Sequence, residues 1–217
     1  VTGAGGTIGS ELVRQIADIG PETLVLFDSA EYLLYEIDMA ITREHPSLEK
    51  RPYLGDVRDR QRIDEVIARE KPELVFHAAA LKHVPMVERN PNEGVLTNVV
   101  GTRNVADACR AADVRLMVHI STDKAVNPAN VMGATKRLAE GYCQALDLSG
   151  RENESTRFVV VRFGNVLGSR GSVVPLFQSQ LARGGPLTVT DPEMTRYFMT
   201  VHEAVELVLQ ASALGLT

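Results

Sequence analysis

Two lysines and one carboxylate are the side chains of this 217-residue chain best placed to move protons. Asp123 and Lys124 follow an apolar run at residues 115–120, and Lys136 comes four residues after Met132 in a helical pattern, so the latter two share one helix face. Desolvation lowers the pKa of a lysine and raises that of a carboxyl. In one crevice these groups supply a base and an acid near neutral pH, whereas in solvent each is an ordinary surface charge.

A glycine-rich turn opens the chain and leads into a helical pattern at residues 10–19. Gly3, Gly6 and Gly9, with Thr7 and Ile8 between the last two, allow backbone amides and a helix N-terminus to approach a pyrophosphate. The next apolar run ends at Asp28, where a dinucleotide-binding fold places the carboxylate that binds a ribose hydroxyl. The alternative is a glycine-rich turn with a surface aspartate.

The same aspartate bears on the choice of cofactor. A carboxylate accepts a hydrogen bond from a free 2′-hydroxyl and repels a 2′-phosphate. Residues 28–31 (DSAE) offer no basic side chain to a phosphate. We therefore expect NAD, with NADP disfavoured.

Short β-branched runs alternate with longer helical patterns along most of the chain. The runs are at residues 23–27, 73–77, 115–120 and 158–163, and the helical patterns are at 31–43, 60–70, 91–112 and 131–148. This alternation predicts an α/β fold, a Rossmann-like doubly wound parallel sheet with helices on both faces. A phosphate loop of this kind follows a buried strand, so we expect the first strand to be clipped and the chain to be a piece of a longer protein.

Glycines and prolines interrupt the alternation from Gly164 onward. We therefore expect a NAD-binding domain at residues 1–163 and part of a smaller C-terminal substrate-binding lobe at 164–217, which ends in an amphipathic helix at 201–214.

Ligands of such sheets bind at the carboxyl ends of the strands. Asp56 and Val57 follow one predicted strand and are placed to meet an adenine. Three small residues follow the next strand and leave room for a flat ligand, although they equally suit tight packing: Ala78, Ala79 and Ala80. Residues 121–124 follow the strand after that, so we expect all of these segments to converge on one crevice.

Composition excludes several classes of function. The net charge of −5 without a long basic run disfavours nucleic-acid binding. No apolar run approaches the ~18–20 residues that a membrane span requires. Cys109 and Cys143 lie in helical patterns without metal-ligand spacing, so we expect no metal site and two buried, reduced thiols in a cytoplasmic protein.

These motifs, together with Asn98, resemble the extended short-chain dehydrogenase/reductases. Longer segments are similar to the bacterial nucleotide-sugar 4,6-dehydratases of polysaccharide biosynthesis, which act on UDP-N-acetylglucosamine. The segments are 80–85 (ALKHVP), 121–128 (STDKAVNP), 132–137 (MGATKR), 162–168 (RFGNVLG) and 194–199 (MTRYFM). The resemblance spans essentially the whole chain.

The resemblance implies NAD-dependent removal of water from UDP-N-acetylglucosamine or a related UDP-sugar, giving a UDP-4-keto-6-deoxy sugar. It implies that Lys124 is the base at C5, that Asp123 protonates the departing 6-hydroxyl, that Lys136 holds the nicotinamide ribose and that Thr122 lines the same place. Further implied contacts are Asn98 near the active site, Lys82 and His83 near the nicotinamide and sugar, and Asn165, Ser172, Arg196 and Met199 at the UDP-sugar. For Asn98 the alternative is helix packing, for His83 core packing, and for Arg196 a surface salt bridge.

Met132 departs from the usual pattern, because extended reductases carry a tyrosine there. Methionine cannot accept the proton of the 4-hydroxyl, which leaves Thr122, Lys136 or a water for that role. Among the dehydratases, the methionine form resembles those that retain the configuration at C5. A nucleotide-sugar epimerase and a non-catalytic dinucleotide sensor are the alternatives; Asp123 and Lys124 favour elimination.

Two further expectations concern geometry and assembly. Neighbours on an extended strand point to opposite sides, so Asp123 and Lys124 reach one sugar only if the chain has left the strand there. The helices at 91–112 and 131–148 resemble those that pair subunits in the family, which implies a homo-oligomer. Membrane attachment is expected only through segments outside this sequence, with this domain on the cytoplasmic side.

Overall fold

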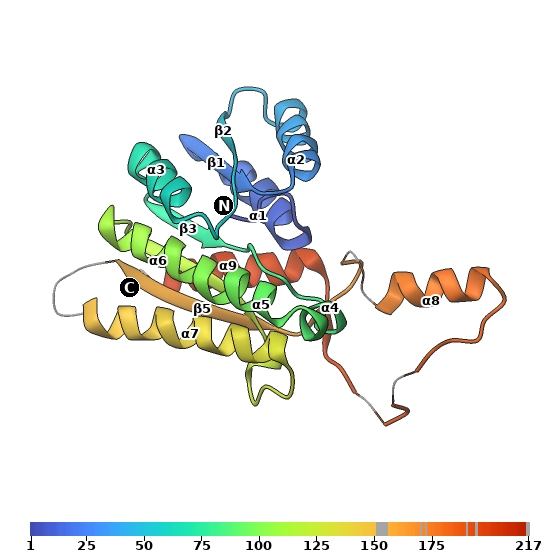
Figure 1. Ribbon diagram of the computed structural model, residues 1–217. Helices are drawn as coiled ribbons and strands as arrows, with labels where there is room; N and C mark the ends of the chain where they lie inside the picture. The colour runs from blue at the N-terminus through green and yellow to red at the C-terminus, as the bar shows by residue number, and fades with distance from the viewer. Residues whose placement is uncertain (151–155, 170, 172, 190, 194, 216–217) are drawn as a thin grey trace.

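Figure 1 shows the computed structural model, which describes residues 1–150, 156–169, 171, 173–189, 191–193 and 195–215. The helices are α1 (Thr7–Ile19), α2 (Glu31–Glu44), α3 (Arg60–Glu70), α4 (Val84–Arg89), α5 (Pro91–Gly94), the π-helix η1 (Val95–Gly101), α6 (Thr102–Ala111), the 3-10 turn η2 (Asp123–Ala125), α7 (Val131–Gly150), α8 (Val173–Ala182) and α9 (Val201–Leu214). The strands are β1 (Thr23–Asp28), β2 (Glu49–Leu54), β3 (Leu74–His77), β4 (Leu116–Thr122), β5 (Arg157–Phe163), β6 (Asn165–Val166) and β7 (Phe198–Met199).

The central sheet is parallel throughout. β1 pairs with β2, and β4 pairs with both β3 and β5. Thr2 joins the two groups, since it bridges Phe27 of β1 and His77 of β3. The order is therefore β2–β1–Thr2–β3–β4–β5, and Val1 and Thr2 occupy the place in which the sequence predicts the first strand.

Helices cover both faces of this sheet (Figure 1), as the sequence predicts. Alternate residues of β4 point to opposite faces. Leu116 and Val118 pack with α1 and α9, whereas Met117 packs with α3, α6 and α7. Both predicted cysteine thiols are buried on the second face, where burial raises their pKa values.

The C-terminal helix returns to the sheet. Thr200 and Glu203 form a capping box at the start of α9, and Val205 and Val208 are fully buried against β3 and β4. The predicted domain boundary at residue 163 stays a prediction, but α9, which lies beyond it, belongs to the core of the sheet. α8 projects from the body instead (Figure 1), with no buried side chain among its described residues.

One predicted helix is interrupted. The pattern at residues 91–112 forms α5, η1 and α6, because the backbone widens into a π-helix between Val95 and Gly101. π-Helical turns often occur at functional sites. Here the turn carries Asn98, whose amide accepts from the nitrogen of Leu81 (2.8 Å) and donates to its carbonyl (2.9 Å). The predicted helix is therefore present over Pro91–Ala111, and the π-helical segment within it is a feature that the sequence analysis did not predict.

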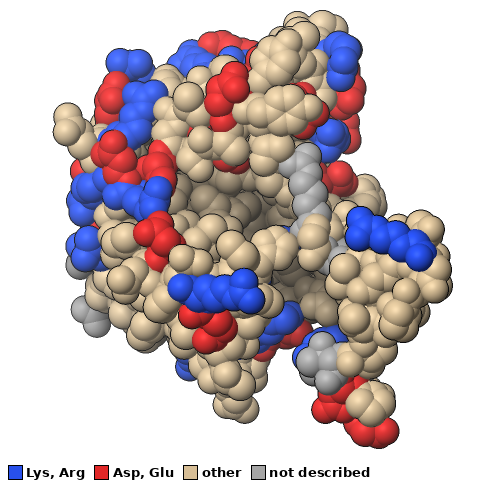
Figure 2. Space-filling view, turned by 45° about the vertical axis from the view of Figure 1, so that its right-hand side comes forward, with Lys and Arg blue, Asp and Glu red and all other residues tan. Residues whose placement is uncertain are grey.

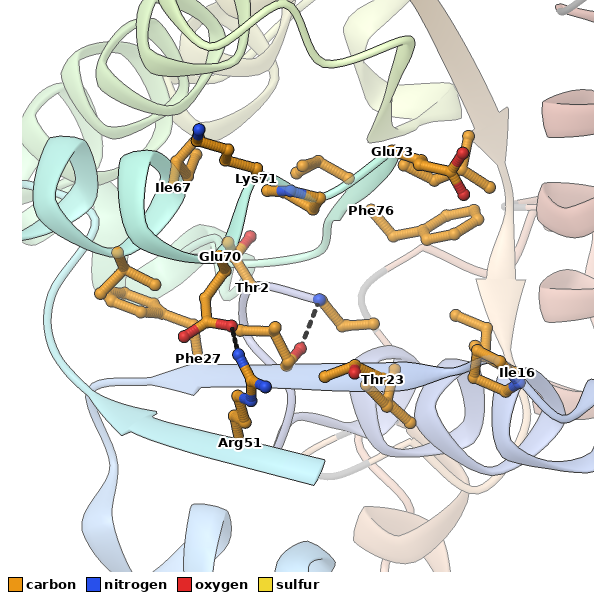
Figure 3. A pocket seen from close by; sticks show the side chains of 18 of the residues that line it. Thr2, Ile16, Thr23, Phe27, Arg51, Ile67, Glu70, Lys71, Glu73 and Phe76 are labelled. Atoms are coloured by element: carbon orange, nitrogen blue, oxygen red, sulfur yellow. Dashed lines mark hydrogen bonds and ion pairs between the residues drawn. The ribbon is translucent and has the colours of Figure 1, made fainter. Parts of the chain in front are cut away.

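A slot with a volume of about 510 Å³ lies between β1 and β3 at the amino ends of the strands (Figure 3). The nitrogen of Val1 donates to the carbonyl of Val25 (2.8 Å), and Arg51 pairs with Glu70 (2.7 Å) at its side. Ligands of parallel sheets bind at the opposite edge. The slot is therefore separate from the predicted crevice. Among the described residues, no helix is both long and apolar enough to cross a bilayer.

Two helical glycines provide a test of the packing at the phosphate loop. A Cβ on Gly9 would lie 1.8 Å from the carbonyl oxygen of Gly3, whereas a Cβ on Gly141 in α7 meets open space. We expect Gly9→Ala to lower the free energy of unfolding by about 1–3 kcal/mol through overpacking. The control Gly141→Ala is expected to raise it by about 0.5–1 kcal/mol. Urea unfolding measures both, and equal effects of the two substitutions would contradict the close packing of Gly9.

Candidate active site

The phosphate loop connects Thr2 to α1 and is shaped by glycine. Gly3 has a φ of 69°, and a Cβ there would lie 2.6 Å from the nitrogen of Ala79. Gly6 is the N-cap of α1 and brings no side chain that competes for the amides of the first turn. Glycine at these positions therefore leaves a cradle whose amides suit a pyrophosphate.

Asp28 supports this loop from the end of β1. Its two carboxylate oxygens accept from the nitrogens of Gly5 (2.8 Å) and Ala30 (2.9 Å). A carboxylate offers about four acceptor positions, so two remain for a ribose hydroxyl. Asp28 thus has a structural role besides the cofactor contact that the sequence predicts.

We call the hollow beside this residue the Asp28 cavity. It has a volume of about 320 Å³ and contains several predicted cofactor contacts: Gly3, Gly6, Asp28, Asp56, Val57, Ala78, Ala79 and Ala80. An ion pair between Arg58 and Glu93 (2.7 Å) lies at its rim. Partial burial of Asp56 is outweighed by hydrogen bonds from Arg58, which lower the pKa of the Asp56 carboxyl.

A second hollow, which we call the Lys124 cavity, adjoins the first through shared lining residues. Its volume is about 440 Å³, and its predicted site residues are Gly6, Thr7, Ile8, Gly9, Ala78, Ala80, Lys82, His83, Thr122, Lys124, Met132, Lys136 and Asn165. Figure 2 shows this side of the molecule deeply hollowed. The convergence of the strand ends that the sequence predicts is therefore present.

The chain leaves strand β4 immediately before the two predicted catalytic groups. Asp123 and Lys124 lie in the turn η2, so they do not alternate as strand residues. Lys124 Nζ donates to Asn165 Oδ1 (2.9 Å) and to Asp123 Oδ1 (3.1 Å), and Thr122 donates to the same Asp123 oxygen (2.9 Å). The turn brings amine and carboxylate together, but of the two only Lys124 lines the Lys124 cavity; the described lining of neither cavity includes Asp123.

The ionisation of Asp123 differs from the expectation for a buried acid. Partial burial favours its neutral form, but hydrogen bonds from Lys124 and Thr122 outweigh it and lower the pKa of the Asp123 carboxyl. The expected rise in pKa was wrong for this unliganded geometry, because the neighbouring amine stabilises the carboxylate.

Lys136 is almost fully buried on α7. Its amine donates to the carbonyl of Ile120 (2.7 Å), and burial lowers its pKa to about 8. His77 and His119 stack below it, with ring centroids 5.4 Å apart. Burial, followed by the charge of Lys136, lowers the pKa of His77 to about 3, and that of His119 also falls well below its usual value. Both imidazoles are therefore neutral, and the lysine is the cation of this region.

Some predicted residues lie elsewhere. Asn98 is buried and bonded to Leu81 and to Thr135 (3.0 Å), which corresponds to the packing alternative. Arg196 is exposed and donates to the carbonyl of Thr195, while Met199 pairs with Val166 in the small sheet. The described lining of the two cavities includes none of these three. Ser172 lies outside the described residues.

The sequence analysis missed a buried acid beside the site. Glu140 is fully buried and binds Ser121 (2.6 Å) and Arg162 (2.8 Å). Its spacing of four residues from Lys136 on one helix face was an available signal. Of the described residues, no three His, Cys, Asp or Glu side chains come together as a metal site.

Comparison with curated proteins gives the family. The family described as "Polysaccharide biosynthesis protein" matches residues 1–217. The "Capsular polysaccharide biosynthesis protein CapD" of Staphylococcus aureus is 53% identical over 99% of this chain and 36% of its own length. The "Uncharacterized membrane protein MJ1061" of Methanocaldococcus jannaschii is 48% identical over 99% of this chain and 62% of its own length. The chain thus spans less than two thirds of these relatives.

More distant relatives carry names of reactions. A "UDP-N-acetylglucosamine 4,6-dehydratase (inverting)" of Campylobacter jejuni is 38% identical, over 96% of this chain and 61% of its own length. A "UDP-glucose 4-epimerase" of Rickettsia canadensis is 41% identical, over 97% of this chain and 61% of its own length.

Solved structures agree with the fold. Pen from Bacillus thuringiensis superposes with a TM-score of 0.89 at 37% identity, over 98% of this chain and 64% of that one. The dTDP-glucose 4,6-dehydratase DesIV of Streptomyces venezuelae, solved with NAD, has a TM-score of 0.81 at 24% identity, over 99% of this chain and 70% of that one. The chain therefore belongs to the polysaccharide biosynthesis protein family, as its motifs indicated, and has a Rossmann fold of the short-chain dehydrogenase/reductase type.

Proposed function

We propose that the protein containing this chain is a nucleotide-sugar 4,6-dehydratase that removes water from UDP-N-acetylglucosamine. The observation that carries the proposal is that Lys124 and its partner Asn165 line a cavity continuous with the phosphate loop, while Asp123 contacts the same amine from outside the described lining. The product is a UDP-4-keto-6-deoxy-N-acetylhexosamine for surface polysaccharide or glycan synthesis. The dehydratase of Campylobacter supports this reading by its name.

A nicotinamide dinucleotide fits the two adjoining cavities. The glycine cradle has no room for a Cβ at Gly3, and Asp28 keeps acceptor positions beside it. We assign NAD rather than NADP to this site, because the carboxylate repels a 2′-phosphate. When bound, a nicotinamide would supply the hydride transfer that links C4 and C6 of the sugar.

The side chains of this protein supply the proton transfers. The amine of Lys124 takes the proton from C5 and later returns a proton to that carbon, and Asp123 gives a proton to the 6-hydroxyl, which leaves as water. Because Lys124 holds Asp123 ionised in the absence of sugar, the sugar must enter between the two groups before Asp123 can act as an acid. Lys136 holds the nicotinamide ribose, and Thr122, Lys136 or a water takes the proton of the 4-hydroxyl, because Met132 stands where the family usually has a tyrosine. We propose that configuration at C5 is retained, in contrast to the inverting relative.

The second candidate is a nucleotide-sugar epimerase, which the Rickettsia relative supports by its name. Epimerisation at C4 needs no acid to expel a hydroxyl, so the Asp123–Lys124 pair favours dehydration. A non-catalytic dinucleotide sensor would need no tyrosine base, which would account for Met132. It would leave Asp123 and Lys124 without a role.

The proposal also covers the setting of the protein. We infer a cytoplasmic domain, either separate or attached to a membrane through other segments, in line with the name of the Methanocaldococcus relative. We infer a homo-oligomer, because exposed apolar side chains lie on η1 and α7, the helices predicted to pair subunits: Val95, Leu96, Leu138 and Leu148.

Incubation of the full-length protein with NAD and UDP-N-acetylglucosamine in deuterated water tests the reaction. We expect a 4-keto-6-deoxy product with deuterium at C5, identified by mass spectrometry and NMR, because solvent exchanges with the base that removes the C5 proton. An isomer of the substrate would indicate the epimerase, and an unchanged sugar would indicate the sensor.

The base is tested by Lys124→Ala. We expect kcat to fall by about 10³-fold, since general-base catalysis contributes 10²–10⁴-fold, while NAD affinity changes by less than about three-fold. Lys124→Arg keeps the positive charge but cannot accept the proton, so it is expected to be equally inactive. Lys71→Ala is the control, because this lysine is exposed and lies at the opposite edge of the sheet. It is expected to keep the kcat of the wild type. Turnover that survives in Lys124→Ala removes Lys124 from this role.

The choice of cofactor is tested by Asp28→Asn. The amide keeps the size of the side chain but removes the charge that repels a 2′-phosphate, so we expect the ratio of NAD to NADP affinity to fall about ten-fold, or ~1.4 kcal/mol. Isothermal titration with both dinucleotides measures the ratio. Asp113→Asn, on the exposed turn after α6, is the matched control. An unchanged ratio in Asp28→Asn would contradict the ribose contact.

A further inference from the structure

Glu140 joins three elements behind the Lys124 cavity. Its carboxylate is fully buried on α7. Arg162 of β5 donates to it through Nε (2.8 Å) and Nη2 (2.5 Å), and Ser121 of β4 donates through Oγ (2.6 Å). Arg137, one helical turn earlier, donates to the second oxygen (3.3 Å). The charge is therefore fully paired, as burial requires.

Its two strand partners belong to the same rung of the sheet. Ser121 faces Arg162 in the parallel register, and one further rung, Thr122 with Phe163, follows before both chains leave the sheet. Lys124 and Asn165 lie just beyond that rung on the two chains, and they are joined by the 2.9 Å hydrogen bond. Glu140 thus clamps the two strands directly behind the bond that orients the amine.

We propose that Glu140 is a positioning residue, which sets the separation of the ends of β4 and β5 and so holds Lys124 against Asn165 and Asp123. The inference rests on the proposed dehydratase function for its kinetic consequence. Glu140 does not line the Lys124 cavity as described, so it acts through the strands rather than on the sugar. A displacement of about 1 Å in a catalytic group can lower a rate by 10²-fold.

The chain provides a matched control at the other end of the same strand. Asp147, two helical turns after Glu140 on α7, accepts from Nε of Arg157 (3.0 Å) and from the nitrogen of Phe158 (2.9 Å). Arg157 pairs with Leu116 in the first rung of the β4–β5 ladder. This second ion pair, in which only the carboxylate is buried, fastens the same helix to the same strand, far from Lys124.

The test compares Glu140→Gln, Ser121→Ala and Asp147→Asn in the full-length protein. For Glu140→Gln we expect kcat to fall by about 10²-fold with KM and NAD affinity within about three-fold of the wild type. Ser121→Ala removes a single hydrogen bond and keeps the buried ion pair, so it is expected to fold and to lose about ten-fold in kcat. Asp147→Asn is expected to keep kcat within about three-fold of the wild type. In urea unfolding it is expected to lose about as much stability as Glu140→Gln.

Two results would overturn the proposal: Glu140→Gln retaining its kcat, or Asp147→Asn losing as much kcat as Glu140→Gln. A second readout does not depend on turnover. The rate at which acetic anhydride labels the Lys124 amine, measured by mass spectrometry relative to Lys71, is expected to rise in Glu140→Gln and Ser121→Ala but not in Asp147→Asn. If the wild type converts no UDP-sugar, the proposed function fails, and this labelling ratio alone decides on positioning: an unchanged ratio in Glu140→Gln refutes it.

Discussion

Parallel hydrogen bonding along β4 sets the position of the chemistry in this chain. The strand pairs with β3 on one side and β5 on the other, so all three end at one edge of the sheet. Different residues follow the three strands at this edge: small residues follow β3, the Asp123–Lys124 turn follows β4, and Asn165 follows β5. These groups meet because the register allows no other arrangement, since a slip of one residue would turn every side chain to the opposite face.

Charge is distributed unevenly around this edge. The interior of the sheet holds two neutral imidazoles, and the buried Lys136 amine has a pKa near 8 because of desolvation. Carboxylates are kept ionised by paired cations, Glu140 by Arg162 and Asp123 by Lys124. Such close pairs of acid and base are typical of sites that move protons, since a small displacement of one partner changes the proton affinity of the other.

Much of this arrangement could be predicted from the sequence. Apolar periodicity located β1, β3, β4 and β5 but not β2, whose residues (EKRPYL) are mostly polar. The glycine spacing with Asp28 located the phosphate loop, because it depends on local chain properties. Contacts between distant segments were not predictable in the same way. The pKa of Asp123 depends on a 3.1 Å contact with Lys124, and the bonds of Asn98 in the π-helix join it to Leu81, 17 residues earlier. The packing of α9 on the sheet likewise brings together residues more than 80 positions apart.

The bonds of Asn98 constrain how this fold can respond to a ligand. One side-chain amide gives Leu81 the donor and acceptor that a neighbouring strand would otherwise provide. Leu81 lies in the wall shared by both cavities, so a shift of that wall would leave a buried amide unsatisfied. The opposite side, with β6 and β7, is held by a ladder of only two rungs. The wall at Leu81 is therefore fixed by buried side-chain hydrogen bonds, whereas the described residues of β6 and β7 are joined by one short ladder.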